Sequence, residues 1–105
     1  MNEYKIEYLQ TFKDDLNDIV RYITLKLDNR PASHKLIDDV QKKIELLKAN
    51  PEIYQYYDFV KPLKRKYRYF VVGNFITFYS VDKKSRVVTI YRILYSKQNI
   101  NSAMK

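Results

Sequence analysis

Apolar residues near the N-terminus first alternate with polar ones and then recur at the spacing of a helix. Tyr4, Ile6 and Tyr8 alternate with charged residues, which predicts a short strand with one buried face. From about residue 10 or 11 to residue 27, the apolar positions follow the spacing of an amphipathic helix. The expected buried stripe of this helix comprises Phe12, Leu16, Ile19, Val20, Ile23 and Leu27.

A second amphipathic helix is expected after a short break. Asn29-Arg30-Pro31 interrupts the first pattern, and Pro31 fits the first position of a new helix, where its missing N–H is not needed. Asn50-Pro51 is expected to end that helix, because proline cannot continue it. The short connector predicts an antiparallel helix hairpin. The apolar stripe of the second helix comprises Leu36, Ile37, Val40, Ile44 and Leu47.

Residues 51–66 follow neither period and are expected to be irregular. The segment is rich in tyrosine and phenylalanine, which implies that it packs on the body of the protein and is not a free linker. It ends in the basic run Lys61-Pro62-Leu63-Lys64-Arg65-Lys66.

Three β-rich runs complete the chain. The runs at 67–72 and 75–81 flank Gly73-Asn74, which holds the only glycine and predicts a tight hairpin turn with positive φ. A turn over 82–85 and a third strand over 86–94 extend the hairpin into a meander. The element order is therefore β-α-α-β-β-β, and we predict an α+β fold in which an antiparallel helix hairpin packs on a small antiparallel sheet.

Ionic charge is divided unevenly along the chain. Residues 1–60 carry 9 Lys/Arg and 11 Asp/Glu, a balance of −2, whereas residues 61–105 carry 11 Lys/Arg and one acid, Asp82, a balance of +10. A basic segment attracts polyanions, and its interleaved aromatic rings offer flat faces to unstacked bases. The pattern favours a nucleic-acid partner, although a solvated basic face over an aromatic core would have the same composition.

Composition limits the class of protein. A chain of 105 residues suits a single domain over residues 1–105, and the absence of cysteine excludes disulfides and thiol chemistry. No run has the length of a membrane span or the character of a signal peptide, so a cytoplasmic protein without a membrane partner is expected. The only histidine, His34, is expected to lie exposed on the second helix. Neither a metal nor a cofactor is expected.

This ordered set of features resembles the RelE/ParE superfamily of bacterial type II toxins over nearly the whole chain. The resemblance rests on Asp15-Leu16, Ile19 and Tyr22-Ile23 of the first helix, on Asn50-Pro51 after the second, on the hairpin at 67–79, and on the last strand at 88–97. It implies the toxin of a type II toxin–antitoxin system, with a small cognate antitoxin as partner that shields the basic surface.

The resemblance implies one of two mechanisms. Nuclease members of the superfamily are ribosome-dependent mRNA endonucleases that use Lys, Arg and Tyr without a metal. The chain would then be an mRNA interferase that inhibits translation, with the ribosome and mRNA as partners. ParE-like members instead inhibit DNA gyrase and have no catalytic residues of their own. We expect the nuclease and keep the gyrase inhibitor as the alternative. An RNA-binding accessory protein fits the charge but not the resemblance.

The resemblance also places candidate catalytic residues on the strands. Arg68 matches a basic position on the first hairpin strand and would stabilise phosphate. Tyr95 and Lys97, at the end of the last strand, form a candidate acid/base and phosphate pair. Other basic positions of the nuclease members correspond here to Phe70 and Ile76, and a C-terminal histidine of many relatives corresponds to Tyr95.

Four cations are candidate nucleic-acid contacts. Lys64-Arg65-Lys66 precedes the first hairpin strand and would either be solvated or clamp a phosphate backbone. Arg92 has two alternatives. Among the apolar residues of the last strand it must pair with a carboxylate, such as Asp15 or Asp18, because a lone buried charge is too costly. On an open face it would join Arg68 in a phosphate groove.

Overall fold

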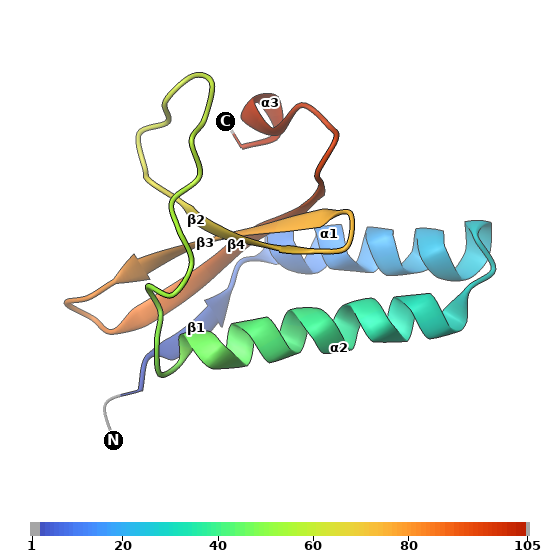
Figure 1. Ribbon diagram of the computed structural model, residues 1–105, viewed down its shortest axis with the longest axis horizontal. Coiled ribbons are helices and arrows are strands. Elements are labelled where there is room, and N and C mark those ends of the chain that lie inside the picture. The colour runs from blue at the N-terminus through green and yellow to red at the C-terminus, as the bar shows by residue number, and fades with distance from the viewer. Residues whose placement is uncertain (1–2, 105) are drawn as a thin grey trace.

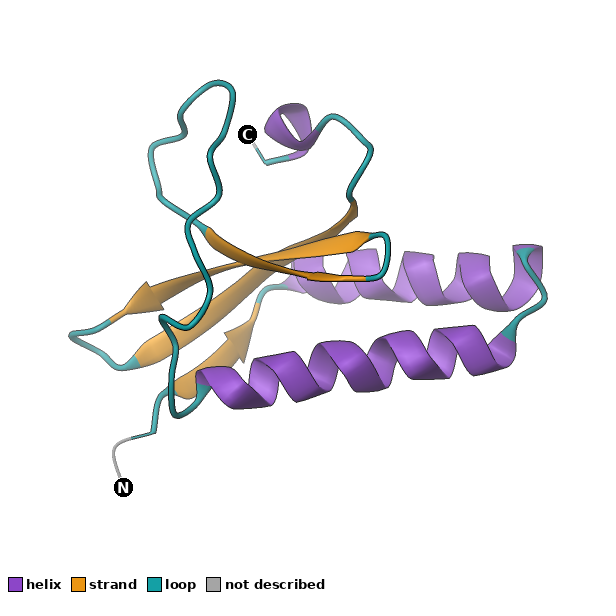
Figure 2. Ribbon diagram, viewed as in Figure 1, coloured by secondary structure: helices purple, strands orange, loops and turns teal. Residues whose placement is uncertain are grey.

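Two helices cover one face of a four-stranded sheet, and a long loop with a short C-terminal helix covers part of the other (Figure 1). This arrangement is seen in the computed structural model of the protein, which describes residues 3–104. The α+β prediction is confirmed, as the colouring by element type makes plain (Figure 2). The elements are β1 (Lys5–Tyr8), α1 (Gln10–Arg21), the π-helix η1 (Tyr22–Lys26), α2 (Arg30–Leu47), β2 (Arg68–Val72), β3 (Phe75–Asp82), β4 (Val87–Tyr95) and α3 (Ile100–Ala103).

The sheet has the strand order β1-β4-β3-β2. Strands β2, β3 and β4 form the expected antiparallel meander, but β1 runs parallel to β4, with Lys5 opposite Val87. The expected antiparallel sheet is therefore a mixed one. Alternation of apolar residues predicts a strand without giving its direction, and no tight turn joins β1 to its neighbour to impose an antiparallel pairing.

Helix α1 completes the edge of β4 that β1 leaves open. Strand β1 pairs only with residues 87–90 of β4. Beyond that point the Thr11 hydroxyl donates to the Tyr91 carbonyl at 2.8 Å, and the Ile93 N–H donates to the Asp15 carboxylate at 3.2 Å. Because side chains of α1 bond these backbone groups, the open half of the edge is not left for another strand to pair with.

Each face of the sheet has its own apolar cluster. On the helix face, the stripe predicted for α2 packs against the sheet, and Val40, Ile44 and Leu47 are fully or almost fully buried. On the other face, Ile76, Phe78 and Leu94 lie beneath Ile100 and Met104 of the C-terminal segment. Aromatic residues of the 51–66 loop pack there too, as expected, with the Tyr57 and Phe78 ring centroids 5.1 Å apart.

The tight turns follow the local sequence. Gly73 has a φ of +57°, the positive value that favours glycine at the first central position of a two-residue hairpin. At the β3–β4 turn, one Asp82 carboxylate oxygen accepts the N–H groups of Lys84 and Ser85 at 3.0 and 3.3 Å. These bonds lower the pKa of Asp82. Asn29 caps α2, because its side chain accepts the Ala32 N–H at 3.1 Å.

The first helix departs from the continuous α-helix that its apolar spacing predicts. It changes to a π-helix over η1, where the Leu27 N–H donates to the Tyr22 carbonyl at 3.2 Å. Leu27, expected in the buried stripe, is 55% exposed, so that part of the prediction was wrong. A π-turn adds a residue to the helical repeat and rotates the following side chains off the stripe.

Candidate functional site

Arg68, the first residue of β2, binds the irregular loop to that strand. Its guanidinium donates to the Tyr54 carbonyl at 2.7 Å and pairs with the Glu52 carboxylate at 3.2 Å. It also lies over the Tyr56 ring, 4.1 Å from the centroid. The side chain is only 13% exposed. Both Nη atoms are therefore engaged within the protein, and a carboxylate already compensates the charge.

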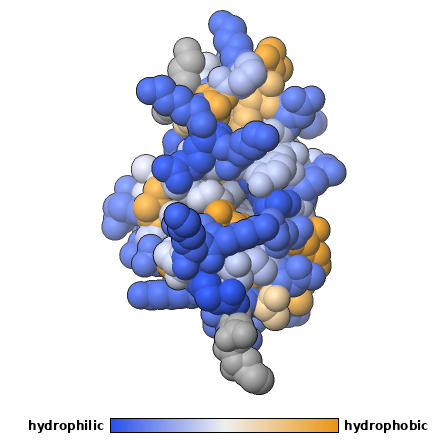
Figure 3. Space-filling model, turned by 90° about the vertical axis from the view of Figure 1, so that its left-hand side faces the viewer, coloured by the Kyte–Doolittle hydropathy of each residue, from blue (hydrophilic) through white to orange (hydrophobic). Residues whose placement is uncertain are grey.

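A basic cleft opens beside this tie, between the loop and the β3–β4 turn. It has a volume of about 430 Å³ and is lined by Tyr56, Arg65, Lys66, Arg68, Ser80, Val81, Asp82, Lys83 and Lys84. Figure 3 views the molecule from this end, and hydrophilic side chains dominate the face. Of the predicted nucleic-acid contacts, Arg65 and Lys66 line the cleft, whereas Lys64 is exposed on the same loop outside its lining. From here on, "basic cleft" denotes these nine residues.

Arg92 takes the first of its two alternatives, because it is paired. Its Nε lies 2.7 Å from one Asp15 oxygen and its Nη2 lies 2.9 Å from the other, in a two-pronged ion pair. A third donor, Nη1, reaches the Ala103 carbonyl of α3 at 2.9 Å. The bond to Asp15 raises the pKa of Arg92. We therefore leave Arg92 out of any phosphate groove.

Tyr95 and Lys97 lie at the opposite end of the sheet from Arg68. Tyr95 ends β4, with its ring 6.1 Å from that of Phe75, and Lys97 is exposed in the turn that follows. Tyr95 lines an apolar groove of about 660 Å³ between η1 and the β2–β3 hairpin. The other residues that line this groove are Asp18, Ile19, Tyr22, Ile23, Leu27, Asn29, Ala32, Asn74 and Phe75.

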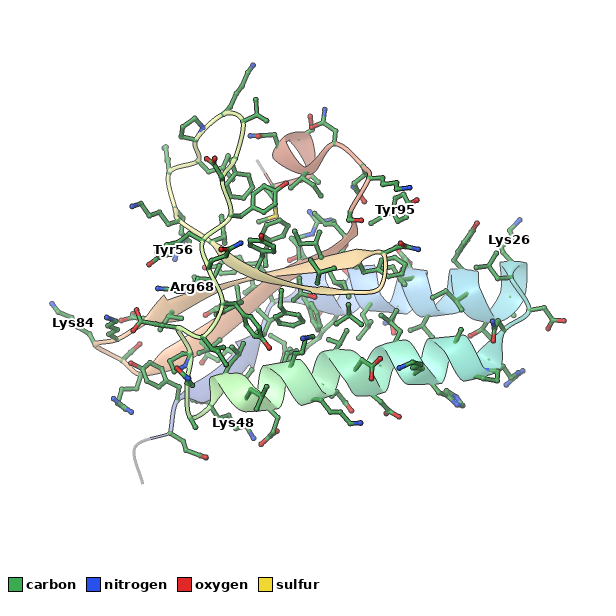
Figure 4. The ribbon with its side chains drawn as sticks, in the orientation of Figure 1. Lys26, Lys48, Tyr56, Arg68, Lys84 and Tyr95 are labelled. Atoms are coloured by element: carbon green, nitrogen blue, oxygen red, sulfur yellow. The ribbon has the colours of Figure 1, made fainter. Side chains whose placement is uncertain are left out.

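The three predicted catalytic residues are therefore not brought together. Arg68 pairs with Tyr79 on β3, whereas Tyr95 pairs with Phe75, four residues away on the same strand. At about 3.3 Å per residue, the two positions differ by about 13 Å along β3, and they lie on strands that flank β3 on opposite sides. Figure 4 shows the separation directly, with Arg68 beside Tyr56 and Tyr95 near the other end of the sheet.

Sequence reasoning missed Tyr56, Lys83 and Lys84 as members of the basic cleft. The signal was available in part, because the hairpin register carries the β3–β4 turn past the start of β2 and toward the basic run of the loop. The sequence pattern could not predict the path of the irregular loop that carries Tyr56.

Among the described residues, no group of three or more acidic, His or Cys side chains could hold a metal ion, and no helix is long and apolar enough to cross a membrane.

A family model decides the identity of the chain. Residues 6–100 match the family described as "ParE toxin of type II toxin-antitoxin system, parDE". The chain belongs to the ParE toxin family. This ParE-family protein is accordingly the toxin component of a type II toxin–antitoxin system. A comparison with curated proteins gave no match.

Solved structures with the same fold come from toxin–antitoxin complexes. The chromosomal ParDE system of Pseudomonas aeruginosa contains a chain similar to this ParE-family toxin with a TM-score of 0.66 and 15% identity, covering 92% of this chain and 100% of that one. The RelBE2 complex of Mycobacterium tuberculosis gives 0.57 and 20%, covering 90% and 93%. The RelE–RelB complex of Pyrococcus horikoshii OT3 gives 0.58 and 13%, covering 93% and 99%. At these identities the likeness concerns the fold.

Proposed function

We propose that this ParE-family toxin acts by binding its target, as an inhibitor of DNA gyrase, and not by cutting RNA. The observation that carries the proposal is the distance between its candidate catalytic groups. Arg68 sits at one end of the sheet, engaged by Glu52 and Tyr54, and Tyr95 with Lys97 sits at the other. RNA cleavage needs a base, an acid and a phosphate-stabilising cation around one scissile bond.

A cognate antitoxin completes the proposed function. The similar structures are those of the RelBE2 toxin–antitoxin complex, a ParDE toxin–antitoxin system and a RelE–RelB complex. The apolar groove beside Tyr95 supports such a partner, because Tyr22, Leu27 and Tyr95 are 55%, 55% and 43% exposed there. Large apolar side chains exposed together on a small protein mark a surface that another protein covers.

The deciding experiment compares two targets with the same protein preparation. Purified toxin is added to DNA gyrase with relaxed plasmid, and separately to a cell-free translation reaction whose mRNA is mapped by primer extension. We expect loss of supercoiling with mRNA 5′ ends unchanged, and relief of inhibition when the antitoxin is present. New ribosome-dependent 5′ ends together with normal supercoiling would refute the proposal.

The nuclease is retained as a second candidate because of the basic cleft. Exposed Arg65, Lys66 and Lys84 lie beside the half-exposed ring of Tyr56, a combination suited to RNA. If cleavage is seen, Tyr95→Phe tests whether Tyr95, at the other end of the sheet from the cleft, takes part in it, since the substitution removes one hydroxyl and keeps the ring. Arg68→Ala is a poor choice, because it also breaks the tie to Glu52 and Tyr54.

A further inference from the structure

The basic cleft holds more positive charge than the protein itself neutralises. Five of its nine residues are cations, and they face one acid of the lining, Asp82. That carboxylate is already occupied by the backbone of its own turn. Glu52, next to the cleft, pairs with both Arg68 and Lys83, at 3.2 Å each.

Three cations of the cleft form no close ion pair with a carboxylate of the described residues. Among the described residues, none of the ion pairs within 4.0 Å involves Arg65, Lys66 or Lys84. All three are exposed, and they come from two segments, the loop and the β3–β4 turn, that line the cleft together. An anion entering the cleft therefore meets cations from both segments.

Aromatic rings hold two of these cations, Arg65 and Lys66, in place. The Lys66 ammonium lies 5.7 Å from the Tyr56 centroid, and the Arg65 guanidinium lies 5.6 Å from that of Tyr91. Tyr56 is itself 51% exposed while Arg68 stacks on it. Cation–π contacts restrict long side chains before a ligand arrives, which lowers the entropy that binding must overcome. A half-exposed ring in the lining of the cleft also gives a base a surface to stack on.

We propose that the basic cleft binds the phosphodiester backbone of a nucleic acid, with Arg65, Lys66 and Lys84 as the phosphate contacts and Tyr56 as a stacking surface. This goes beyond the proposed function, because it requires neither gyrase nor the ribosome. The exposed ring among the cations favours nucleic acid over an acidic polypeptide, which has no base to stack.

The number of unpaired cations fixes the expected dependence on salt. Each phosphate contact contributes a slope in log K against log salt of about −0.9 on duplex DNA and about −0.7 on a single strand. With three contacts, the slopes are about −2.7 and −2.1. Loss of two contacts, in Lys66→Gln with Lys84→Gln, should leave a slope of about −0.9 on duplex DNA or −0.7 on a single strand.

The test is fluorescence anisotropy with labelled single-stranded RNA, single-stranded DNA of the same sequence, and the matching duplex. The cleft variant Lys66→Gln/Lys84→Gln is compared with Lys13→Gln/Lys42→Gln, which removes two exposed lysines from α1 and α2 and gives the same net charge. We expect the cleft variant to bind about tenfold more weakly than the control variant, because two exposed ionic contacts together contribute roughly that factor.

Comparison of the affinities for the three nucleic acids identifies which kind the cleft binds. Stacking on Tyr56 is indicated if Tyr56→Leu weakens binding to the single strands more than binding to the duplex. Equal affinities and equal salt slopes for the cleft and control variants would overturn the proposal. Competition by polyglutamate as effective as that by nucleic acid at the same charge concentration would also overturn it, in favour of an acidic protein partner. Because the assay contains only toxin and nucleic acid, either failure leaves the proposed gyrase inhibition untouched.

Discussion

Removing the Asp15 carboxylate should loosen three parts of the fold at once. Asp15 binds the Arg92 guanidinium at 2.7 and 2.9 Å and accepts the Ile93 N–H at 3.2 Å, and Arg92 in turn holds the Ala103 carbonyl. In Asp15→Ala, the arginine is left without its counter-charge and the Ile93 N–H without an acceptor.

The magnitude follows from how far this pair is buried. The Arg92 and Asp15 side chains are 29% and 16% exposed, between an exposed pair, worth about 0–1 kcal/mol, and a fully buried one, whose disruption costs about 3–5 kcal/mol. With about 1 kcal/mol for the orphaned backbone N–H included, we expect a loss of about 2–3 kcal/mol in the free energy of unfolding. For a domain of this size, that lowers Tm by about 9–14 °C.

Urea denaturation followed by circular dichroism measures the loss, and a double-mutant cycle of Asp15→Ala with Arg92→Met isolates the pair. Asp18→Ala is the matched control, since Asp18 is exposed on the same helix, and it should cost less than about 0.5 kcal/mol. A loss in Asp15→Ala no larger than that of the control, or a coupling energy near zero, would refute the reasoning.

Three further predictions concern single positions. Burial raises the pKa of the Tyr79 hydroxyl to about 12, above its value in the unfolded chain. As the pH rises, this hydroxyl therefore loses its proton in the unfolded chain before it does so in the folded protein. The free energy of unfolding should fall by about 2 kcal/mol from pH 10 to 12, and Tyr79→Phe should remove that part of the slope in urea titrations. The same substitution should cost about 1 kcal/mol at pH 7, because the hydroxyl no longer donates to the Pro51 carbonyl. Gly73→Ala meets no atom within 4 Å of the added carbon, so only the positive φ opposes it. It should cost about 1 kcal/mol, and Gly73→Asn less, by the same assay. His34→Ala, at an exposed position on α2, should leave growth inhibition by the expressed toxin unchanged; loss of toxicity at normal protein levels would assign His34 a role.

Local sequence signals predicted the elements where one residue type decides the conformation. Asn29 with Pro31 marked the start of α2, and the only glycine marked the β2–β3 turn. The exposure of Leu27 could not be predicted in this way. Its spacing continues the α-helical stripe, but the chain changes to a π-helix first, and apolar periodicity does not distinguish the two.

The candidate site was predictable only where regular elements carry it. The pairing of Arg92 with Asp15 was one of two alternatives, and it holds because β4 and α1 both have regular periods. Arg68 is different, since Glu52 and Tyr54 come from the irregular loop. Without a period there is no way to infer which backbone carbonyl faces an arginine, and Arg68 looks like a free phosphate ligand.

The position of β4 in the sheet imposes an order on folding during synthesis. This strand lies between β1 and β3, so the sheet cannot be completed before residues 87–95 have been made. The first strand must wait, unpaired, until residues 87–95 have left the ribosome, because its partner strand is the last of the four to be made. A prematurely terminated product that lacks β4 has no sheet in which β1 and β3 are joined. The cell therefore obtains either a complete toxin or a fragment without this fold.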